Sequence, residues 1–580
     1  MKMSRRDVVC VIGAALLFAV HALAREPPKV SLDDLGTLIG KESLTRGNRT
    51  IHSFQGIPFA EPPSGVNRFK APIPKIWSGK LVATSPGRPC IQPDDEYHPV
   101  AGDVDPEDCL TLNVYTPDLT HNGSLPVAIY YHGGGFRVGS ESSFRPDFLL
   151  DRDVVLVVPQ YRLGPFGFLS MQNEMIPGNA GLLDTLEALK WVNRHISKFG
   201  GNKNKVTVFG QSAGASISNY LMLSPLAKGL LHGVIMNSGS AIADWAHDSE
   251  PVREARLIAS FAGCQGGDQT VSECLLNLTP EDLLQAFVKM FHKGLTPFPV
   301  ISRPDEPAAT NFMPENPADL ARKRAFNNVP LLAGATRHDF LFAANKFHNK
   351  LKSTGMINNE TFIRESLVDE IIKTQELNDP VGIINDMIEH RYFSYLTPKK
   401  RGNAREILPG FLDFVNTIAM KAPALQMAKL NSEADNYLYT FDYQGRYHSP
   451  TKGIDDVKGI LTNGAIHTDD MIYLAPRVKE PFNDEEIAVS NTMVDLWANF
   501  IISGNPNEPK KLSIPYWPHY NSTDKYYYEI NTVPKAKQDF TNEFTAAIQD
   551  HLRNSAARFP SSSSDLSIIL LAILSIFYLE

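Results

Sequence analysis

The chain alternates short apolar runs with longer segments whose apolar residues recur at helical spacing. The short runs have the length and composition of buried strands. They lie at residues 126–131, 154–158, 205–209, 233–237, 329–333 and 437–441. Between the second and third runs, apolar residues fall on one face of a helix: Leu182, Leu183, Leu186, Leu189 and Val192. Strands that alternate with helices in this way predict an α/β fold with a large, mostly parallel central sheet flanked by helices.

The third run leads into Gly-Gln-Ser-Ala-Gly at residues 210–214, where small residues open a helix. A serine on such a tight strand-to-helix turn stands clear of the sheet and can attack a carbonyl group. Gly210 and Gly214 leave room where a Cβ atom would collide with neighbouring backbone. The Ala213 amide then lies at a helix N-terminus, which favours a developing oxyanion. By itself the motif is weak, since roughly 0.2 matches are expected by chance. It makes Ser212 a candidate nucleophile that needs partners.

Three glycines follow the first apolar run, in the sequence His-Gly-Gly-Gly-Phe at residues 132–136. Glycines placed directly after a strand let backbone N–H groups face outward with no side chain in the way. Lipases and esterases build part of their oxyanion hole from this position. Further upstream, frequent prolines in residues 51–63 exclude a helix and predict extended chain on the surface.

Composition narrows the class of protein. With 43% hydrophobic and 21% charged residues the chain is globular, and at 580 residues its length alone allows more than one domain. A formal net charge of −8 is small for this size, so nucleic acid is not an expected partner. No Cys/His pattern has the spacing of a zinc site, and we expect neither a metal nor a cofactor.

Both ends have the character of processing signals. Arg5 and Arg6 precede an apolar run and an Ala-Leu-Ala sequence, which predicts a signal peptide at residues 1–24. At the other end, small residues, a polar spacer and an apolar run of 14 residues predict a glycosylphosphatidylinositol anchor at Asn554 or Ser555. That run is shorter than the ~20 residues that cross a bilayer. A short tail anchor and an unprocessed tail are the alternatives. We therefore expect a cell-surface protein tethered to the outer leaflet, or otherwise a secreted one.

Secretion makes the cysteines and asparagines informative. Cys10 leaves with the signal peptide, and nearest-neighbour pairing of the other four predicts the disulfides Cys90–Cys109 and Cys264–Cys274. Sequons for N-glycosylation occur at five positions: Asn48, Asn122, Asn277, Asn359 and Asn521.

Taken in order, these motifs resemble the type-B carboxylesterases and cholinesterases of the α/β-hydrolase superfamily. The resemblance covers about residues 30–545. It implies a single α/β-hydrolase domain over residues 25–553, with residues 554–580 as the anchor signal. Helical insertions at about 250–325 and 345–430 would form the cap and gorge rim. The resemblance further implies three particular roles: an ion pair between Arg68 and Glu107, oxyanion donors at Gly134, Gly135 and Ala213, and a supporting hydrogen-bonding role for Ser238.

A serine nucleophile needs a histidine base, and in α/β-hydrolases the chain order is serine, acid, histidine. The chain has sixteen histidines, so one histidine alone carries no information. His467 lies in Gly-Ala-Ile-His-Thr-Asp-Asp at residues 464–470, after the last apolar run. This matches the family's Gly-x-x-His-x-x-Asp/Glu pattern, and it predicts His467 as the base.

The acid departs from the family's usual residue. A glutamate followed by glycine is common after the fifth apolar run, whereas this chain has Asp339 followed by Phe340. Aspartate fills this role in many α/β-hydrolases, but its side chain is one methylene shorter. The loop of His467 or the backbone of Asp339 must then lie roughly 1–1.5 Å closer. The alternative is that Asp339 is a surface turn residue and that Asp469 or Asp470 assists His467.

Further details concern the branch of the family. Cholinesterases carry a tryptophan in the loop closed by Cys90 and Cys109, but residues 91–108 contain none, and Tyr97 is their one aromatic residue. Without this tryptophan the cation–π contact to a quaternary ammonium group is missing, which argues against choline esters as substrates. Gly-Gln-Ser-Ala-Gly and the histidine motif resemble insect carboxylesterases and juvenile hormone esterases. Asp184-Thr185, where those esterases usually have Asp-Gln, and Asp339, where they have Glu, argue against a hormone-specific role.

Two functional hypotheses follow. The first is a serine carboxylesterase that hydrolyses small carboxylic esters through an acyl-enzyme, with Ser212, His467 and Asp339 as the triad. The second is a catalytically inactive, cholinesterase-like adhesion protein, a possibility that depends on the bulky Phe340 displacing Asp339. The sequence indicates neither the physiological ester nor the oligomeric state.

Overall fold

A computed structural model describes residues 26–93, 105–120, 123–291, 297–303, 305–375, 377, 381–448, 464–475 and 481–558. The predicted signal peptide at 1–24, with Cys10, lies outside these residues. So do Tyr97, Asn122 and the C-terminal tail from residue 559.

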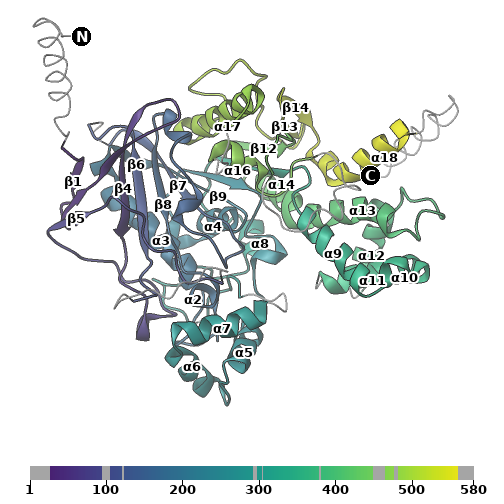
Figure 1. The fold of residues 1–580 in the computed structure, drawn as a ribbon, viewed down its shortest axis with the longest axis horizontal. Coiled ribbons are helices and arrows are strands. Elements are labelled where there is room, and N and C mark those ends of the chain that lie inside the picture. The colour runs from purple at the N-terminus through teal and green to yellow at the C-terminus, as the bar shows by residue number, and fades with distance from the viewer. Residues whose placement is uncertain are drawn as a thin grey trace, which may run out of the picture.

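The centre of the molecule is an eleven-stranded mixed sheet (Figure 1). Its strand order is β14-β13-β12-β11-β10-β9-β7-β8-β6-β4-β3, and the strands from β8 to β13 pair in parallel. The strands are β3 Lys41–Leu44, β4 Thr50–Pro58, β6 Thr111–Thr116, β7 Leu125–Tyr131, β8 Val155–Pro159, β9 Gly201–Gln211, β10 Gly233–Asn237, β11 Leu331–Thr336, β12 Asn436–Phe441, β13 Tyr526–Ile530 and β14 Lys535–Gln538. A second sheet contains β1 Lys29–Ser31, β2 Thr37–Ile39 and β5 Lys80–Val82.

Helices cover both faces of the large sheet because its central strands are apolar on both sides. In β7, Val127 and Ile129 pack into one buried cluster with helices α3 and α4, while Ala128 and Tyr130 pack into another with α17. The helices are α2 Gly164–Phe168, α3 Ala180–His195, α4 Ala213–Leu223, α5 Pro251–Phe261, α6 Asp268–Asn277, α7 Pro280–Phe291, α8 Pro317–Arg322, α9 Leu341–Ser353, α10 Glu360–Glu365, α11 Leu367–Thr374, α12 Ile383–Met387, α13 Ala404–Asn416, α14 Ala422–Leu430, α16 Asp469–Leu474, α17 Asp484–Ser503 and α18 Ala546–Arg558.

Two helical lobes project from this body. Helices α5–α7 form one, at the bottom of Figure 1, and α9–α13 form the other, at its right, with the C-terminal helix α18 above it. Each lobe has its own buried apolar cluster. The first lobe falls within the expected insertion at about 250–325, and the second, which begins at Leu341, overlaps the one expected at about 345–430. The predicted α/β-hydrolase architecture is confirmed.

One local prediction was only partly right: residues 51–63 contain no helix and are largely extended, as predicted, but their placement was wrong. Residues 51–63 do not wrap the surface, because most of them form β4 inside the large sheet, with Ile51 and Phe54 fully buried. The prolines misled the prediction because they begin at Pro58, where the strand ends, and leave the pairing of the strand with β6 intact.

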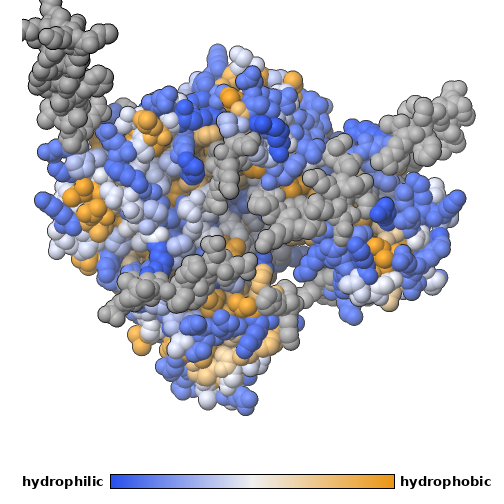
Figure 2. All heavy atoms as spheres, viewed as in Figure 1, coloured by the Kyte–Doolittle hydropathy of each residue, from blue (hydrophilic) through white to orange (hydrophobic). Residues whose placement is uncertain are grey.

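Both predicted disulfides are present, and the described sequons lie at the surface. Cys90 is bonded to Cys109 and Cys264 to Cys274. Asn48, Asn277 and Asn359 are exposed, and Asn521 is partly exposed. Figure 2 shows a mainly hydrophilic face on which hydrophobic residues form small separate groups. No helix within the described ranges is long and apolar enough to cross a membrane.

Candidate active site

The candidate residues come from the ends of neighbouring strands. Ser212 directly follows β9, and Asp339 follows β11. His467 lies beyond β12, and the three glycines follow β7. Because these strands are parallel, their carboxyl ends meet at one edge of the sheet. The doubly wound topology therefore gathers residues that are far apart in sequence.

Ser212 has the strained backbone of a nucleophile on a tight turn. Its φ of 59° and ψ of −125° lie outside the regions that non-glycine residues ordinarily adopt. The turn is possible because the backbones around it approach closely. A Cβ on Gly214 would lie 1.9 Å from the Tyr131 carbonyl oxygen, and one on Gly210 would lie 2.3 Å from the Gly214 carbonyl carbon. Only glycine fits at either position.

The glycine loop lies directly against this turn. A Cβ on Gly133 would be 3.1 Å from the Ser212 Cβ. Gly134 and Gly135 have positive φ values of 112° and 61°, which turn the backbone after the strand. Within the described ranges, the amides of Gly134, Gly135 and Ala213 donate no hydrogen bond to another backbone or side-chain group. Ala213 directly follows Ser212, and the glycine loop contacts Ser212 through Gly133, so the three unused amides belong to segments that adjoin the serine.

Asp339 and His467 are in direct contact. His467 Nδ1 donates to Asp339 Oδ1 in a short hydrogen bond. The other carboxylate oxygen accepts hydrogen bonds from Ser238 Oγ at 2.5 Å and from the Thr336 amide at 2.8 Å. The Asp339 side chain is fully buried, whereas 14% of the His467 side chain is exposed. The carboxylate is thus fixed from both sides, and Ser238 makes a hydrogen bond of the kind that the family resemblance implied.

Backbone pairing explains how the shorter aspartate reaches the histidine. His338 forms a parallel bridge with Ile466, and its amide donates to the Ala465 carbonyl oxygen at 2.8 Å. This pairing joins the two loops one residue before Asp339 and one residue before His467. Their side chains then leave the bridge next to each other.

The charges of the pair reinforce one another. Burial opposes the ionised form of Asp339, but the positive charge and hydrogen bond of His467 outweigh it, so the pKa of Asp339 lies below its ordinary value. Burial lowers the pKa of His467. The negative charge of Asp339 and its hydrogen bond act in the opposite direction, as do the charges of Asp470 and Asp469, and the pKa of His467 is raised overall. An ionised acid beside a readily protonated imidazole is what a proton-accepting histidine requires.

The alternative acids contact other groups. Asp469 accepts from the Ile466 amide at 2.9 Å and lies 3.1 Å from His448 Nδ1. Asp470 accepts from Asn237 Nδ2 and from the Tyr439 hydroxyl, each at 3.0 Å. Burial raises the pKa of Asp470 to about 6. Neither carboxylate is hydrogen-bonded to the His467 ring within the described residues.

Gln211 is a site residue that sequence reasoning missed. Its side-chain nitrogen lies 3.1 Å from His467 Nε2, the ring atom that faces away from Asp339. Within the described ranges the Ser212 hydroxyl forms no hydrogen bond, so the Gln211 amide occupies the position at Nε2. Its place next to the predicted nucleophile was the one available signal.

Phe340 does not displace Asp339. Its amide donates to Asn416 Oδ1 at 2.5 Å, and its ring packs against Phe342 at a centroid distance of 4.5 Å. The Phe342 ring in turn lies 5.8 Å from that of His467. Beyond the glycine loop, Phe136 contacts the rings of Trp245 and Phe298. The surroundings of the site are therefore strongly aromatic.

Two buried ion pairs brace the frame around the site. Arg68 forms a bidentate pair with Glu107, as the resemblance implied. Arg162 forms another with Asp184, at 2.7 and 2.6 Å, and the sequence analysis did not anticipate it. Among the described residues, no group of three or more His, Cys, Asp or Glu side chains could hold a metal ion.

The sheet topology and the serine turn define an α/β-hydrolase. More narrowly, the chain belongs to the carboxylesterase family, whose sequence model matches residues 26–548. The family together with its named esterase relatives assigns the chain as a carboxylic ester hydrolase.

Named relatives agree with this assignment. Over 504 residues the chain is 32% identical to a juvenile hormone esterase of Tribolium castaneum, a match that covers 82% of this chain and 84% of the relative. It is 31% identical to carboxylesterase 1D of Rattus norvegicus over 557 residues, 91% of this chain and 94% of the relative. The crystal structure of a juvenile hormone esterase from Manduca sexta, with OTFP covalently attached, superimposes with a TM-score of 0.73 at 26% identity. That match covers 91% of this chain and 100% of the other.

Proposed function

We propose that the protein hydrolyses carboxylic esters by a serine mechanism in which Ser212 is the nucleophile, His467 the base and Asp339 the acid. The single observation that carries this proposal is the buried contact between Asp339 and His467 Nδ1, at the sheet edge that also presents Ser212. The Nδ1 proton is held by Asp339, so Nε2 keeps its lone pair. The neutral Gln211 amide, which donates toward Nε2, fits the same tautomer.

The proposed reaction has two halves. Ser212 Oγ attacks the ester carbonyl carbon while its proton passes to His467 Nε2, and the carbonyl π electrons move to the oxygen. The electron pair on the oxyanion then re-forms the carbonyl group, the bond to the alcohol oxygen breaks, and His467 gives the proton to the departing alkoxide. The acyl group stays on Ser212 Oγ as the acyl-enzyme. In the second half, water attacks the carbonyl carbon of the acyl-enzyme while one of its protons passes to His467. The bond to Ser212 Oγ breaks, His467 returns the proton to Oγ, and the carboxylic acid is released. Substrate binding has to bring Ser212 Oγ to the position that the Gln211 amide now occupies, since apo geometry often tightens only in the complex.

The oxyanion is assigned to the amides of Gly134, Gly135 and Ala213. They are unpaired within the described residues; Ala213 follows Ser212, and the loop of the two glycines contacts Ser212 through Gly133. A donor aimed at charge that develops only in the transition state is worth about 3–4 kcal/mol. Ser238 supports the acid indirectly, through its hydrogen bond to Asp339.

The substrate class is proposed only as carboxylic esters with apolar groups. Aromatic rings surround the site, and relatives with different names match this chain at nearly equal identity. A covalently attached compound in the Manduca sexta structure is in keeping with an acyl-enzyme mechanism here. The inactive adhesion protein has no support, because each role has a residue in place and Phe340 leaves Asp339 undisturbed.

Hydrolysis of p-nitrophenyl esters with short to long acyl chains tests the proposal. We expect turnover by the wild type and a fall of about 10⁶-fold in kcat for Ser212→Ala. Retained turnover in Ser212→Ala, at the same circular dichroism and melting temperature, would exclude Ser212 as the nucleophile.

We also propose that the signal peptide is removed, that sequons are glycosylated and that a lipid anchor is attached at Asn554 or Ser555. Support comes from the sequence pattern and from the exposure of Asn48, Asn277 and Asn359. A phosphatidylinositol-specific phospholipase is expected to release the protein from cells that express it. Persistence on the membrane after treatment would reject the anchor.

A further inference from the structure

The C-terminal helix α18 contacts the loop that carries Asp339. Its residue Asp550 accepts two hydrogen bonds from Arg337, from Nε at 2.8 Å and from Nη2 at 2.9 Å. Asp550 also lies 3.2 Å from His338 Nε2. Arg337 and His338 directly precede Asp339, so one carboxylate on the last helix holds both residues that lead to the acid.

The His338 ring is wedged between this carboxylate and the loop of His467. A Cβ on Gly464 would lie 2.2 Å from the ring carbon Cδ2, so the ring packs directly against the Gly464 backbone. The buried Nδ1 has no hydrogen-bond partner among the described residues, and Nε2 therefore carries the proton that faces Asp550. Together with the amide bond from His338 to Ala465, these contacts make His338 a link between α18 and both loops.

Helix α18 is itself firmly placed. Its first amides, those of Ala547 and Ile548, donate to the buried Asp413 carboxylate of α13 at 2.9 and 2.8 Å. The two residues are almost fully buried, in a cluster that includes Ile466. Lys421 Nζ donates both to the Arg337 carbonyl oxygen, at 3.0 Å, and to the Glu543 carbonyl oxygen just before the helix, at 2.6 Å. Asp550 thus projects from a fixed helix and not from a loose tail.

We propose that Asp550 is a positioning residue for the Asp339–His467 pair and acts through Arg337 and His338. This inference rests on the proposed function, because it assumes that the pair works as acid and base. Arg337 has two other carboxylates within reach, Glu543 at 3.6 Å and Asp442 at 3.7 Å. When the Asp550 charge is removed, the Arg337 guanidinium is drawn toward these two groups. The His338 ring also loses its ion-pair contact with Asp550 on the side away from the His467 loop.

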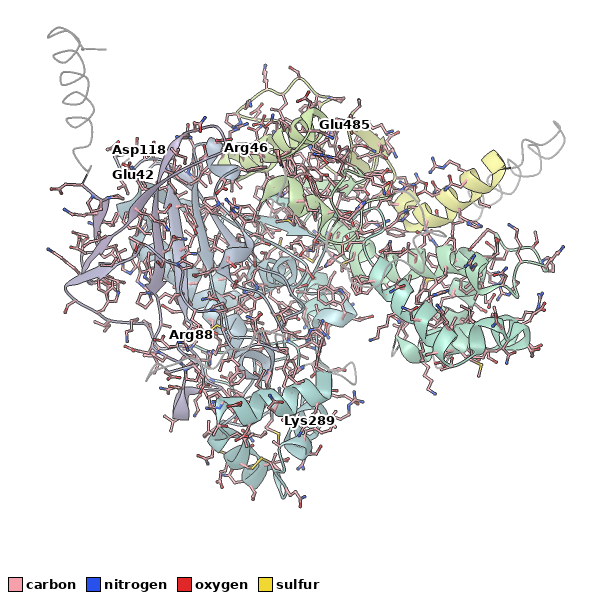
Figure 3. All side chains as sticks on the ribbon, in the orientation of Figure 1. Glu42, Arg46, Arg88, Asp118, Lys289 and Glu485 are labelled. Carbon is pink, nitrogen blue, oxygen red and sulfur yellow. A yellow bond between two sulfur atoms is a disulfide. The ribbon has the colours of Figure 1, made fainter. Side chains whose placement is uncertain are left out.

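The test compares Asp550→Asn with a matched control, Asp151→Asn. Asp151 also accepts a hydrogen bond from an arginine, Arg46, and is similarly buried, with 14% of its side chain exposed against 17% for Asp550. Arg46 lies well apart from α18 (Figure 3). We expect Asp550→Asn to lower kcat roughly 10- to 100-fold with KM within about twofold, since small misplacements of catalytic groups have effects of this size. Asp151→Asn should leave kcat unchanged.

The pH profile distinguishes positioning from a general loss of stability. His467 is faced by Asp339, Asp470 and Asp469, and a looser contact with Asp339 lowers its pKa. The acid limb of kcat/KM should therefore move to lower pH in Asp550→Asn and stay in place in Asp151→Asn. If Asp550→Asn fails to fold, Arg337→Lys replaces it. Lysine keeps the charge but cannot form the two-pronged contact, and we expect the same two changes at smaller size.

The outcomes are separable by labelling with a fluorophosphonate probe. Labelling of the wild type supports the proposed function. If the folded variant, Asp550→Asn or its replacement Arg337→Lys, then has the same kcat and the same acid limb as the wild type, the positioning role is overturned and the proposed function stands. If folded wild type is not labelled, the proposed function falls and the inference falls with it.

Discussion

The two halves of the candidate site are built in different ways. Around Ser212, geometry is set by backbone that is packed against backbone, as at Gly214 and the Tyr131 carbonyl. Around Asp339, it is set by side chains from distant parts of the chain: Asn416 holds the next amide and Asp550 holds the two preceding residues. The first half is steric and local, and the second is polar and long-range.

This difference has a consequence for how each half tolerates change. A Cβ added at Gly210 or Gly214 would lie less than 2.5 Å from backbone atoms, so no larger residue fits there and a short motif fixes the serine half. The acid half can accept an aspartate in place of a glutamate because the bridge between His338 and Ile466 sets the approach of the two loops. Because the position of Asp339 depends on hydrogen bonds from several distant residues, substitution of any of these residues can shift it.

The largest expected effect in this comparison is that of Asp339→Asn. Asparagine removes the negative charge beside His467, and its NH2 group can donate to Nδ1 and favour the wrong tautomer, a change that typically lowers kcat about 10⁴-fold. Asp469→Asn and Asp470→Asn should lower it far less, because their carboxylates contact other groups. Steady-state kinetics on the three purified variants gives the ranking. A larger loss of kcat in Asp469→Asn or Asp470→Asn would assign the acid role to that residue instead of Asp339.

A smaller effect is expected in the serine half, from Gly134→Ala. The added Cβ would lie 1.9 Å from the Val138 carbonyl oxygen, so the loop shifts and its amide leaves the oxyanion position. Displacing one donor should lower kcat by about 10²–10³-fold. Gly229→Ala is the matched control, since Gly229 also has positive φ, 76°, but has nothing within 4 Å of its added Cβ. Equal kcat in both variants would remove Gly134 from the oxyanion assignment.

The smallest effect concerns pH. His467 must be neutral to accept the serine proton, and its raised pKa means that it becomes protonated as pH falls through a value above 6.5. Activity should therefore be full at alkaline pH and lost below that midpoint. Gln211→Glu places a carboxylate near Nε2 and should raise the midpoint by on the order of one pH unit, whereas Gln211→Ala should not. A wild-type midpoint below 6.5 would contradict the charge coupling to Asp339.

The serine half was predictable from sequence because its motif is short and its constraint is steric. The Gly-x-Ser-x-Gly spacing and the glycines after β7 are visible as local motifs, although their roles were assigned only with the other motifs and the family resemblance. In the acid half, the resemblance to the family supplied Asp339 and His467. Nothing in the sequence indicated that Arg337 and His338 would be held by a helix more than 200 residues away, since such pairing depends on tertiary structure.

The placement of β4 and the contact of Gln211 were not predictable from the sequence pattern. The prolines near residues 58–63 suggested surface chain, although they mark the end of a buried strand. The contact of Gln211 with His467 depends on a side-chain direction that the motif does not specify. The same holds for the ring contacts of Phe136 with Trp245 and Phe298, which come from distant parts of the chain.

The most direct test of the central claim is to locate the covalent adduct. Purified protein is treated with a fluorophosphonate, digested and mapped by mass spectrometry, beside Ser212→Ala. We predict one stoichiometric adduct on the peptide that contains Ser212, absent from the variant. An adduct on another residue, or ester hydrolysis that survives without modification of Ser212, would contradict the serine mechanism proposed for this site.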